Sequence, residues 1–298
     1  VTDYNGIAEM TSHGIDQQKR CAELAADAGI DIDMCSQAYL KYLHKLVDEG
    51  KVSEETINTM CRRVLEAKWE LGLFEDANRG HSEKEVTTAV RKKEFMDVAR
   101  QLAGESIVLL KNDGNILPLK KQGKIAVIGP LGKSGRNLYG CWTGNGSSQP
   151  ALGIYDAIKE AVGNNGEVVY ARGSNVFANP DWEAAGQIKN FDVGRDSRSA
   201  EEMIKEAVEV AKNSDVVIAT LGELTDMTGE SQSRADLEMP DVQRDLFKAL
   251  LKTGKPVVLL YITGRPVAMR WEKANAPVIV ETWHGGTEAA HAIADVVF

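Results

Sequence analysis

Apolar residues in the second half of the chain form short, nearly continuous runs. The runs are rich in valine and isoleucine, and polar segments containing glycine separate them. This pattern is typical of strands that are covered on both faces, as in a parallel sheet. The runs read KIAVIGP, EVVYARG, SDVVIATLG, KPVVLLYITG and APVIVETW, and the run IVLLKN precedes them.

Helical patterns lie between several of these runs. The segment SRSAEEMIKEAVEVAKN contains a capping box from Ser199 to Glu202. The segment PDVQRDLFKALLKTG places Pro240 in the first turn of a helix and Gly254 beyond its end. Strands that alternate with helices in this way predict an α/β sandwich with a largely parallel sheet.

The first 75 residues also alternate between strand and helix patterns. VTD reads as the end of a strand, and GIDIDM alternates apolar and acidic residues with the period of a strand. Helices are expected at 12–29, 36–50 and 53–72, the last with Ser53 as its N-cap. Its apolar face is expected to contain Ile57, Met60, Val64 and Leu71. Two parallel strands cannot bury both of their faces, so the pattern predicts further strands upstream.

Composition and charge narrow the classes of function. The chain has 298 residues, 43% hydrophobic and 27% charged, which is ordinary for a globular protein. A net charge of −9 without a basic stretch argues against nucleic acid or an anionic membrane as the main partner. The four cysteines show no CxxC spacing, and Cys21 and Cys61 are expected to be buried small hydrophobes.

Three other motifs are incomplete. In KIAVIGPLGKSG only two residues separate Gly129 from Gly132, which is too short for a phosphate loop, and the glycines also miss the GxGxxG spacing. WHGGT is similar to the oxyanion segment of esterases, but the chain has no GxSxG nucleophile, so His284 is expected to be a packed residue at a strand end. The five histidines show no metal-ligand spacing, and no metal is predicted.

The segment from 221 to 244, LGELTDMTGESQSRADLEMPDVQR, is long, polar and acidic. It leaves a predicted strand at its carboxyl end, where open α/β sheets bind ligands. A solvated acidic loop and a functional loop explain it about equally well. Asp3 poses a similar choice between a helix cap and a catalytic residue at a strand end. Two carboxylates on different domains suggest a cleft, and cleavage of a glycosidic bond is one chemistry that such a pair serves.

At this point the sequence resembles the family 3 glycoside hydrolases, in particular periplasmic bacterial β-glucosidases. VTDYNGIAEM is similar to the strand that carries the nucleophilic aspartate of the family, and AGIDIDM to its last barrel strand. The acidic segment is similar to the loop that bears the general acid/base. The resemblance therefore implies Asp3 as nucleophile and Glu230 as acid/base, with Glu223 as the second choice. It also implies that Tyr4 and Trp142 contact the substrate.

The resemblance implies the fold and the domains as well. Residues 1–75 are expected to be the last two βα units of a (β/α)8-type barrel, 76–97 a linker and connecting helix, and 98–298 the sandwich. Family members have about six earlier barrel strands, so the chain is expected to be a fragment. We expect such a fragment to be weakly active or inactive alone, and its truncated barrel surface to favour self-association.

The implied activity is that of a retaining, exo-acting β-glucosidase. Its substrate is a β-glucoside or oligosaccharide, it requires no cofactor or metal, and its location is periplasmic or secreted. A non-catalytic sugar-binding or scaffolding module is the alternative, and a nucleotide binder is a distant third. Retention of both Asp3 and Glu230 favours the enzyme, because a binding module would not need the pair.

Overall fold

The computed structural model describes residues 1–143, 151–179 and 193–298. The chain forms two compact units, Val1–Ala89 and Val90–Phe298, and each is described by itself. The domain boundaries expected from the sequence stay a prediction. Short 3₁₀ turns cover Met10–His13, Asp113–Asn115, Arg136–Tyr139, Gly163–Asn165 and Thr225–Met227.

The first unit consists of helices around a small apolar core. Its helices are α1 (Gly6–Glu9), α2 (Gln18–Asp27), α3 (Ala38–Asp48), α4 (Glu54–Glu70) and α5 (Glu83–Ala89). Cys21, Ala22 and Leu46 are among the fully buried residues of the core, which confirms the prediction for Cys21. The Ser53 hydroxyl accepts a hydrogen bond from the Thr56 N–H at 3.0 Å, so the predicted N-cap of α4 is also confirmed.

Several expectations for this unit were wrong. VTD and GIDIDM run side by side but do not form regular strands. The predicted helix at 12–29 begins only at Gln18, because Gly14 has a φ of +94° and interrupts it. Cys61 is exposed, since it lies about 100° around α4 from the buried Met60. Leu71, expected on the apolar face, follows the end of α4 and is also exposed. The polar stretch after residue 76 contains α5.

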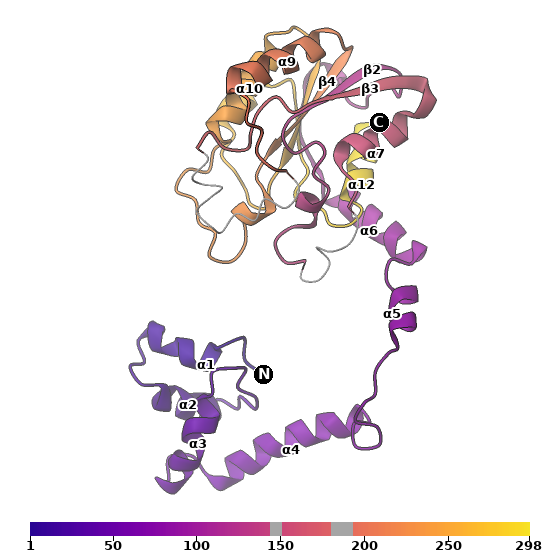
Figure 1. Cartoon of the computed structure of the whole chain (residues 1–298). Helices are drawn as coiled ribbons and strands as arrows, with labels where there is room; N and C mark the ends of the chain where they lie inside the picture. Colours follow the sequence, from indigo (N-terminus) through magenta and orange to yellow (C-terminus); the bar gives the residue numbers. More distant parts are fainter. Residues whose placement is uncertain (144–150, 180–192) are drawn as a thin grey trace. The chain divides into compact units, whose positions relative to one another are not determined.

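The second unit is a six-stranded sheet between two layers of helices (Figure 1). Its strands follow the order β1-β6-β5-β4-β2-β3, and only the pair of β1 and β6 is antiparallel. The strands are β1 (Val108–Asn112), β2 (Gly123–Ile128), β3 (Gly166–Ala171), β4 (Val216–Gly222), β5 (Val257–Ile262) and β6 (Val278–Glu281). The predicted α/β class and largely parallel sheet are confirmed.

Most helices of this unit pack on the two faces of the sheet. They are α6 (Lys93–Ser106), α7 (Ile154–Val162), α9 (Ala200–Lys212), α10 (Asp241–Leu251), α11 (Arg270–Asn275) and α12 (Ala289–Val297). One apolar core joins α7 and α12 to the sheet, and another joins α9 and α10 to its opposite face (Figure 1). The central strands bury side chains on both faces, which explains their continuous apolar runs.

The parallel arrangement brings the carboxyl ends of β4, β5 and β6 to one edge of the sheet. The residues directly after these strands are Glu223, Thr263 and Thr282, and all three are buried. The acidic segment starts at this edge. The acidic segment therefore begins beside the buried residues that follow these three strands.

Candidate active site

Asp3 lies on the surface of the first unit, three residues before the start of α1. One of its carboxylate oxygens accepts a hydrogen bond from the N–H of Tyr4 at 2.7 Å. The side chain of Tyr4 is 63% exposed. Asn5 occupies the N-cap position of α1, so the side chain of Asp3 is not the cap of this helix. The structure thus presents Asp3 and Tyr4 together to solvent.

The backbone around Asp3 is held by the segment that was expected to be the next strand. The Thr2 N–H donates to the carbonyl of Ile32 at 3.0 Å, and the Asn5 N–H donates to the carbonyl of Met34 at 2.9 Å. The Met34 N–H in turn donates to the hydroxyl of Thr2 at 2.9 Å. These bonds align the two segments in parallel and fix the position of the backbone at Asp3.

Glu223, the second choice for the acid/base, is a buried anchor. It follows β4 directly, and its side chain is 1% exposed. One oxygen accepts a hydrogen bond from Arg234 Nη1 at 2.6 Å, and the other lies 3.4 Å from Arg265 Nε. The carboxylate cannot reach a substrate without leaving both guanidinium groups. Glu223 is therefore a buried, ion-paired group, and the choice between Glu230 and Glu223 as the acid/base stays a prediction.

Glu230 lies on an exposed turn of the acidic segment. The turn is tight, because Gly229 has a φ of +104° and Ser231 a φ of +60°. Gly229 packs against Cys141: a β-carbon added at Gly229 would lie 2.5 Å from the Cys141 sulfur and 3.9 Å from Trp142 Nε1. The structure therefore brings Glu230 and the 75% exposed Trp142 onto neighbouring loops. Residues 144–150, which follow this loop, lie outside the described residues.

A buried polar layer lies at the carboxyl ends of β5 and β6 and contacts the start of the acidic segment. Glu281, at the end of β6, accepts hydrogen bonds from the Thr263 hydroxyl at 3.0 Å and the Trp283 N–H at 3.2 Å. Burial raises the pKa of Glu281 to about 7, so this carboxyl is partly protonated near neutral pH. An acidic residue that ends the apolar run APVIVE was the available signal for it.

His284 and Asn137 complete the layer. His284 is packed just beyond β6, as expected, and burial lowers its pKa to about 4. Its Nε2 lies 3.5 Å from the carbonyl oxygen of Glu223. Asn137 donates to the same carbonyl at 3.2 Å and accepts from the Thr225 N–H at 2.6 Å. These contacts hold the backbone at the start of the acidic segment.

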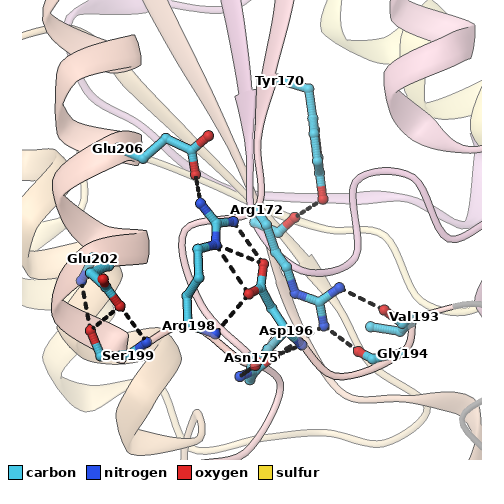
Figure 2. Close-up of polar contacts among 11 residues, drawn as sticks. Tyr170, Arg172, Asn175, Val193, Gly194, Asp196, Arg198, Ser199, Glu202 and Glu206 are labelled. Carbon is cyan, nitrogen blue, oxygen red and sulfur yellow. Dashed lines mark hydrogen bonds and ion pairs between the residues drawn. The ribbon is translucent and has the colours of Figure 1, made fainter.

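A second polar cluster lies beyond the end of β3 (Figure 2). Arg172 donates to the carbonyls of Val193 and Gly194, while Arg198 pairs with both Asp196 and Glu206 at 2.7 Å. The hydrogen bonds from Arg198 lower the pKa of Asp196 to about 2. The capping box from Ser199 to Glu202, also drawn in Figure 2, is confirmed. These carboxylates and guanidinium groups contact one another or the backbone, which indicates a structural role for the cluster.

Two cavities lie among the described residues of the second unit, and neither is lined by Glu230, Glu223 or Trp142. A cavity of about 470 Å³ is lined by Phe177, Arg234 and Met239, among others. A cavity of about 370 Å³ beside the second polar cluster is lined by residues including Lys133 and Tyr170. Within the described ranges, no group of three or more His, Cys, Asp or Glu side chains could hold a metal ion. No described helix is both long and apolar enough to cross a membrane.

The predicted residues therefore form two groups. Asp3 and Tyr4 are adjacent in the first unit, and Glu230 and Trp142 lie on neighbouring loops of the second. The separation of about 5–5.5 Å that a retaining carboxylate pair requires stays a prediction.

Comparisons with known proteins cover both units. Residues 107–298 match the C-terminal domain of glycosyl hydrolase family 3, and residues 1–67 match the N-terminal domain of the same family. The chain is 40% identical to a periplasmic β-glucosidase of Salmonella typhimurium and 33% identical to a β-xylosidase of Formosa agariphila. Each alignment covers 100% of this chain and 40% of the relative.

Solved structures agree with the sequence relatives. The β-glucosidase of Listeria innocua, in complexes with laminaribiose and with isofagomine, matches with a TM-score of 0.83 and 30% identity. The match covers 100% of this chain and 38% of that one, so the chain spans about two fifths of the relatives it matches. The second unit corresponds to the α/β sandwich of these enzymes. With the C-terminal domain model matched across 107–298, the chain belongs to glycosyl hydrolase family 3.

Proposed function

We propose that the chain carries both reactive carboxylates of a retaining β-glucosidase, with Asp3 as the nucleophile and Glu230 as the acid/base. The proposal rests on the exposure of the Asp3 and Glu230 carboxylates in a chain of this family. Both are exposed and each lies beside an exposed aromatic residue, whereas Glu223 is buried against two arginines.

The mechanism has two steps. Ionised Asp3 attacks the anomeric carbon and forms a covalent glycosyl-enzyme, while protonated Glu230 gives its proton to the leaving oxygen. Glu230 then removes a proton from water, and the water displaces Asp3 from the sugar. Tyr4 and Trp142 provide aromatic surfaces beside the two carboxylates, on which an apolar face of a sugar ring can stack.

A glucoside is the favoured substrate. The β-glucosidase relative is 40% identical to this chain and the β-xylosidase relative 33% identical. The name of the first relative also supports a periplasmic location for this protein. Self-association stays a prediction, which the exposed Ile32, Met34 and Leu40 of the first unit support.

The test uses the longest chain in which this sequence occurs, with residues 1–298 measured in parallel. Hydrolysis of nitrophenyl β-glucoside is expected to exceed that of the β-xyloside. Asp3→Asn is expected to lower kcat by about 10⁴-fold or more. A slowly turned-over 2-fluoro-glucoside should label the peptide that contains Asp3, as seen by mass spectrometry. Normal turnover by Asp3→Asn would refute the assignment.

Residues 1–298 alone are expected to be far less active, because positioning of the substrate supplies much of the rate. The alternative function, a non-catalytic sugar-binding module, leads to a different result. In that case the longest chain would bind glucosides without hydrolysing them, and Asp3→Asn would leave the affinity unchanged.

A further inference from the structure

One arginine, from the loop that follows β5, closes the turn that carries Glu230. Arg265 lies just beyond β5, and its Nη2 donates to the carbonyls of both Met227 and Gln232. These two carbonyls lie on either side of the residues from Thr228 to Ser231. One nitrogen atom thus joins the two ends of the turn on which Glu230 lies.

The same arginine is connected to the core of the sheet. Its Nε lies 3.4 Å from Glu223, whose own N–H donates to the carbonyl of Ile262 at 2.8 Å. Glu223 also binds Arg234, and Arg234 donates to the carbonyl of Glu238 at 3.0 Å. Through Arg265 and Arg234, the turn at 228–231 and the later residue Glu238 are both connected to one buried carboxylate at the end of β4.

There is little room for the turn to move toward the strand. A β-carbon added at Gly264 would lie 2.4 Å from the hydroxyl oxygen of Thr228, so the chain beside Arg265 is in close contact with the turn. On another side Gly229 contacts Cys141. The exposed carboxylate of Glu230 is thus attached to a backbone that has close contacts on two sides.

We propose that Arg265 is a positioning residue for Glu230. The inference rests on the proposed function, in which Glu230 is the acid/base. A general acid acts only when its carboxyl lies within hydrogen-bonding distance of the leaving oxygen, and a small displacement lowers the rate steeply. Arg265 fixes the backbone on both sides of Glu230 and so restricts the positions that the carboxyl can sample.

A purely structural role would have different consequences. Loss of a structural arginine lowers the amount of folded protein and affects all substrates equally. Loss of an arginine that positions the acid affects substrates according to how much they need a proton. A dinitrophenyl leaving group needs almost no protonation, whereas a phenyl leaving group needs it strongly.

The test compares Arg265→Met with Arg244→Met in the longest chain that contains the sequence. Arg244 is a matched control, because its side chain is 13% exposed and pairs with Glu238 and Glu272. Arg265→Met is expected to lower kcat/KM for phenyl β-glucoside about 10- to 100-fold more than for the dinitrophenyl glucoside. Arg244→Met should lower both by the same factor. Arg265→Lys keeps the charge but not the planar geometry, and should fall between wild type and Arg265→Met.

Amide hydrogen exchange supplies a readout that does not depend on activity. Exchange at residues 228–232 should become faster in Arg265→Met and remain unchanged in Arg244→Met. Unchanged exchange in Arg265→Met would overturn the inference.

Glu230→Gln separates this inference from the proposed function. That variant should show the same dependence on the leaving group, and more strongly. If it does and Arg265→Met does not, the inference alone is overturned. If Glu230→Gln shows no such dependence, the proposed function fails and the inference fails with it.

Discussion

The two carboxylates proposed to act on one sugar are held in different ways. Asp3 lies in an exposed stretch, and the backbone around it is fixed by hydrogen bonds to Ile32 and Met34 near the surface. Glu230 is also exposed, but its turn is bound to a mostly buried group of Arg265, Glu223 and Arg234. The first site depends on a few local hydrogen bonds, and the second on ionic groups anchored in a sheet.

The second site also contains a comparison within itself. Glu223 and Glu230 are the same residue type in the same acidic segment, yet only Glu223 is packed against guanidinium groups. Burial of a charge is tolerated only when partners compensate for its lost hydration. A reactive carboxylate must instead stay open to substrate. What separates the two roles is the surroundings of the side chain.

The largest expected effect on stability comes from substituting Glu223, the buried residue of this pair. Glu223→Gln removes the charge that faces Arg234 and Arg265, whose side chains are 15% and 19% exposed. Removing one partner from a buried ion pair costs about 3–5 kcal/mol. The free energy of unfolding, from urea titration followed by circular dichroism, should fall by this amount.

Glu230→Gln is the matched control for that measurement. Its side chain is exposed, and the free energy of unfolding should change by no more than about 0.5 kcal/mol. Equal losses in the two variants would show that Glu223 is not an anchor.

Much of the sheet could be predicted from the sequence. The runs that became β2, β4 and β5 are continuous in valine, isoleucine and leucine, because both of their faces are covered by helices. The first unit was harder. VTD and GIDIDM have the composition of strands, but the described residues pair them only with each other and not within a wider ladder.

The candidate site shows a similar limit. Glu230 was assigned because the whole acidic segment resembles a loop of the family, and such a resemblance can be recognised from local sequence alone. The partners of Glu223 could not be predicted in this way. Arg234 lies 11 residues further along the same segment, and Arg265 meets Glu223 only because β4 and β5 are neighbours in the sheet. Such contacts depend on strand order, which local periodicity does not encode.

The second expected effect concerns the dependence of stability on pH. The pKa of Glu281 is raised from 4.5 to about 7, so its folded state prefers the neutral form. Its contribution to stability is complete below pH 4.5 and is lost as the pH rises to about 7. The pKa of His284 is lowered from 6.5 to about 4, and its contribution is lost as the pH falls through that range.

These two contributions oppose each other in the wild type, because their slopes have opposite signs and their pH ranges overlap. Glu281→Gln removes one slope. The stability of wild type relative to this variant should therefore fall by about 3 kcal/mol between pH 4.5 and pH 7. Urea titrations at several pH values measure it, with Glu230→Gln as the control. A constant difference across that range would contradict a buried neutral carboxyl at Glu281.

The smallest expected effect on stability comes from removing one hydrogen bond beside Asp3. The hydroxyl of Thr2 accepts the hydrogen bond of the Met34 N–H, and Thr2→Val removes this acceptor with little change in shape. The free energy of unfolding should fall by only about 0.5–1.5 kcal/mol, the usual worth of one hydrogen bond. Hydrogen exchange at the Met34 amide should become faster, because that amide loses its partner. Thr2→Ser keeps the hydroxyl and should retain the slower exchange.

The size of this loss relative to that of Glu223→Gln decides the comparison. If the backbone around Asp3 is held by separate surface hydrogen bonds, removing one leaves those from Thr2 to Ile32 and from Asn5 to Met34 in place. The effect should then stay local and small. A loss as large as that expected for Glu223→Gln would mean that the segment around Asp3 also forms one cooperative network. Asp3 would then be held as firmly as Glu230, and the difference between the two sites would be only one of burial.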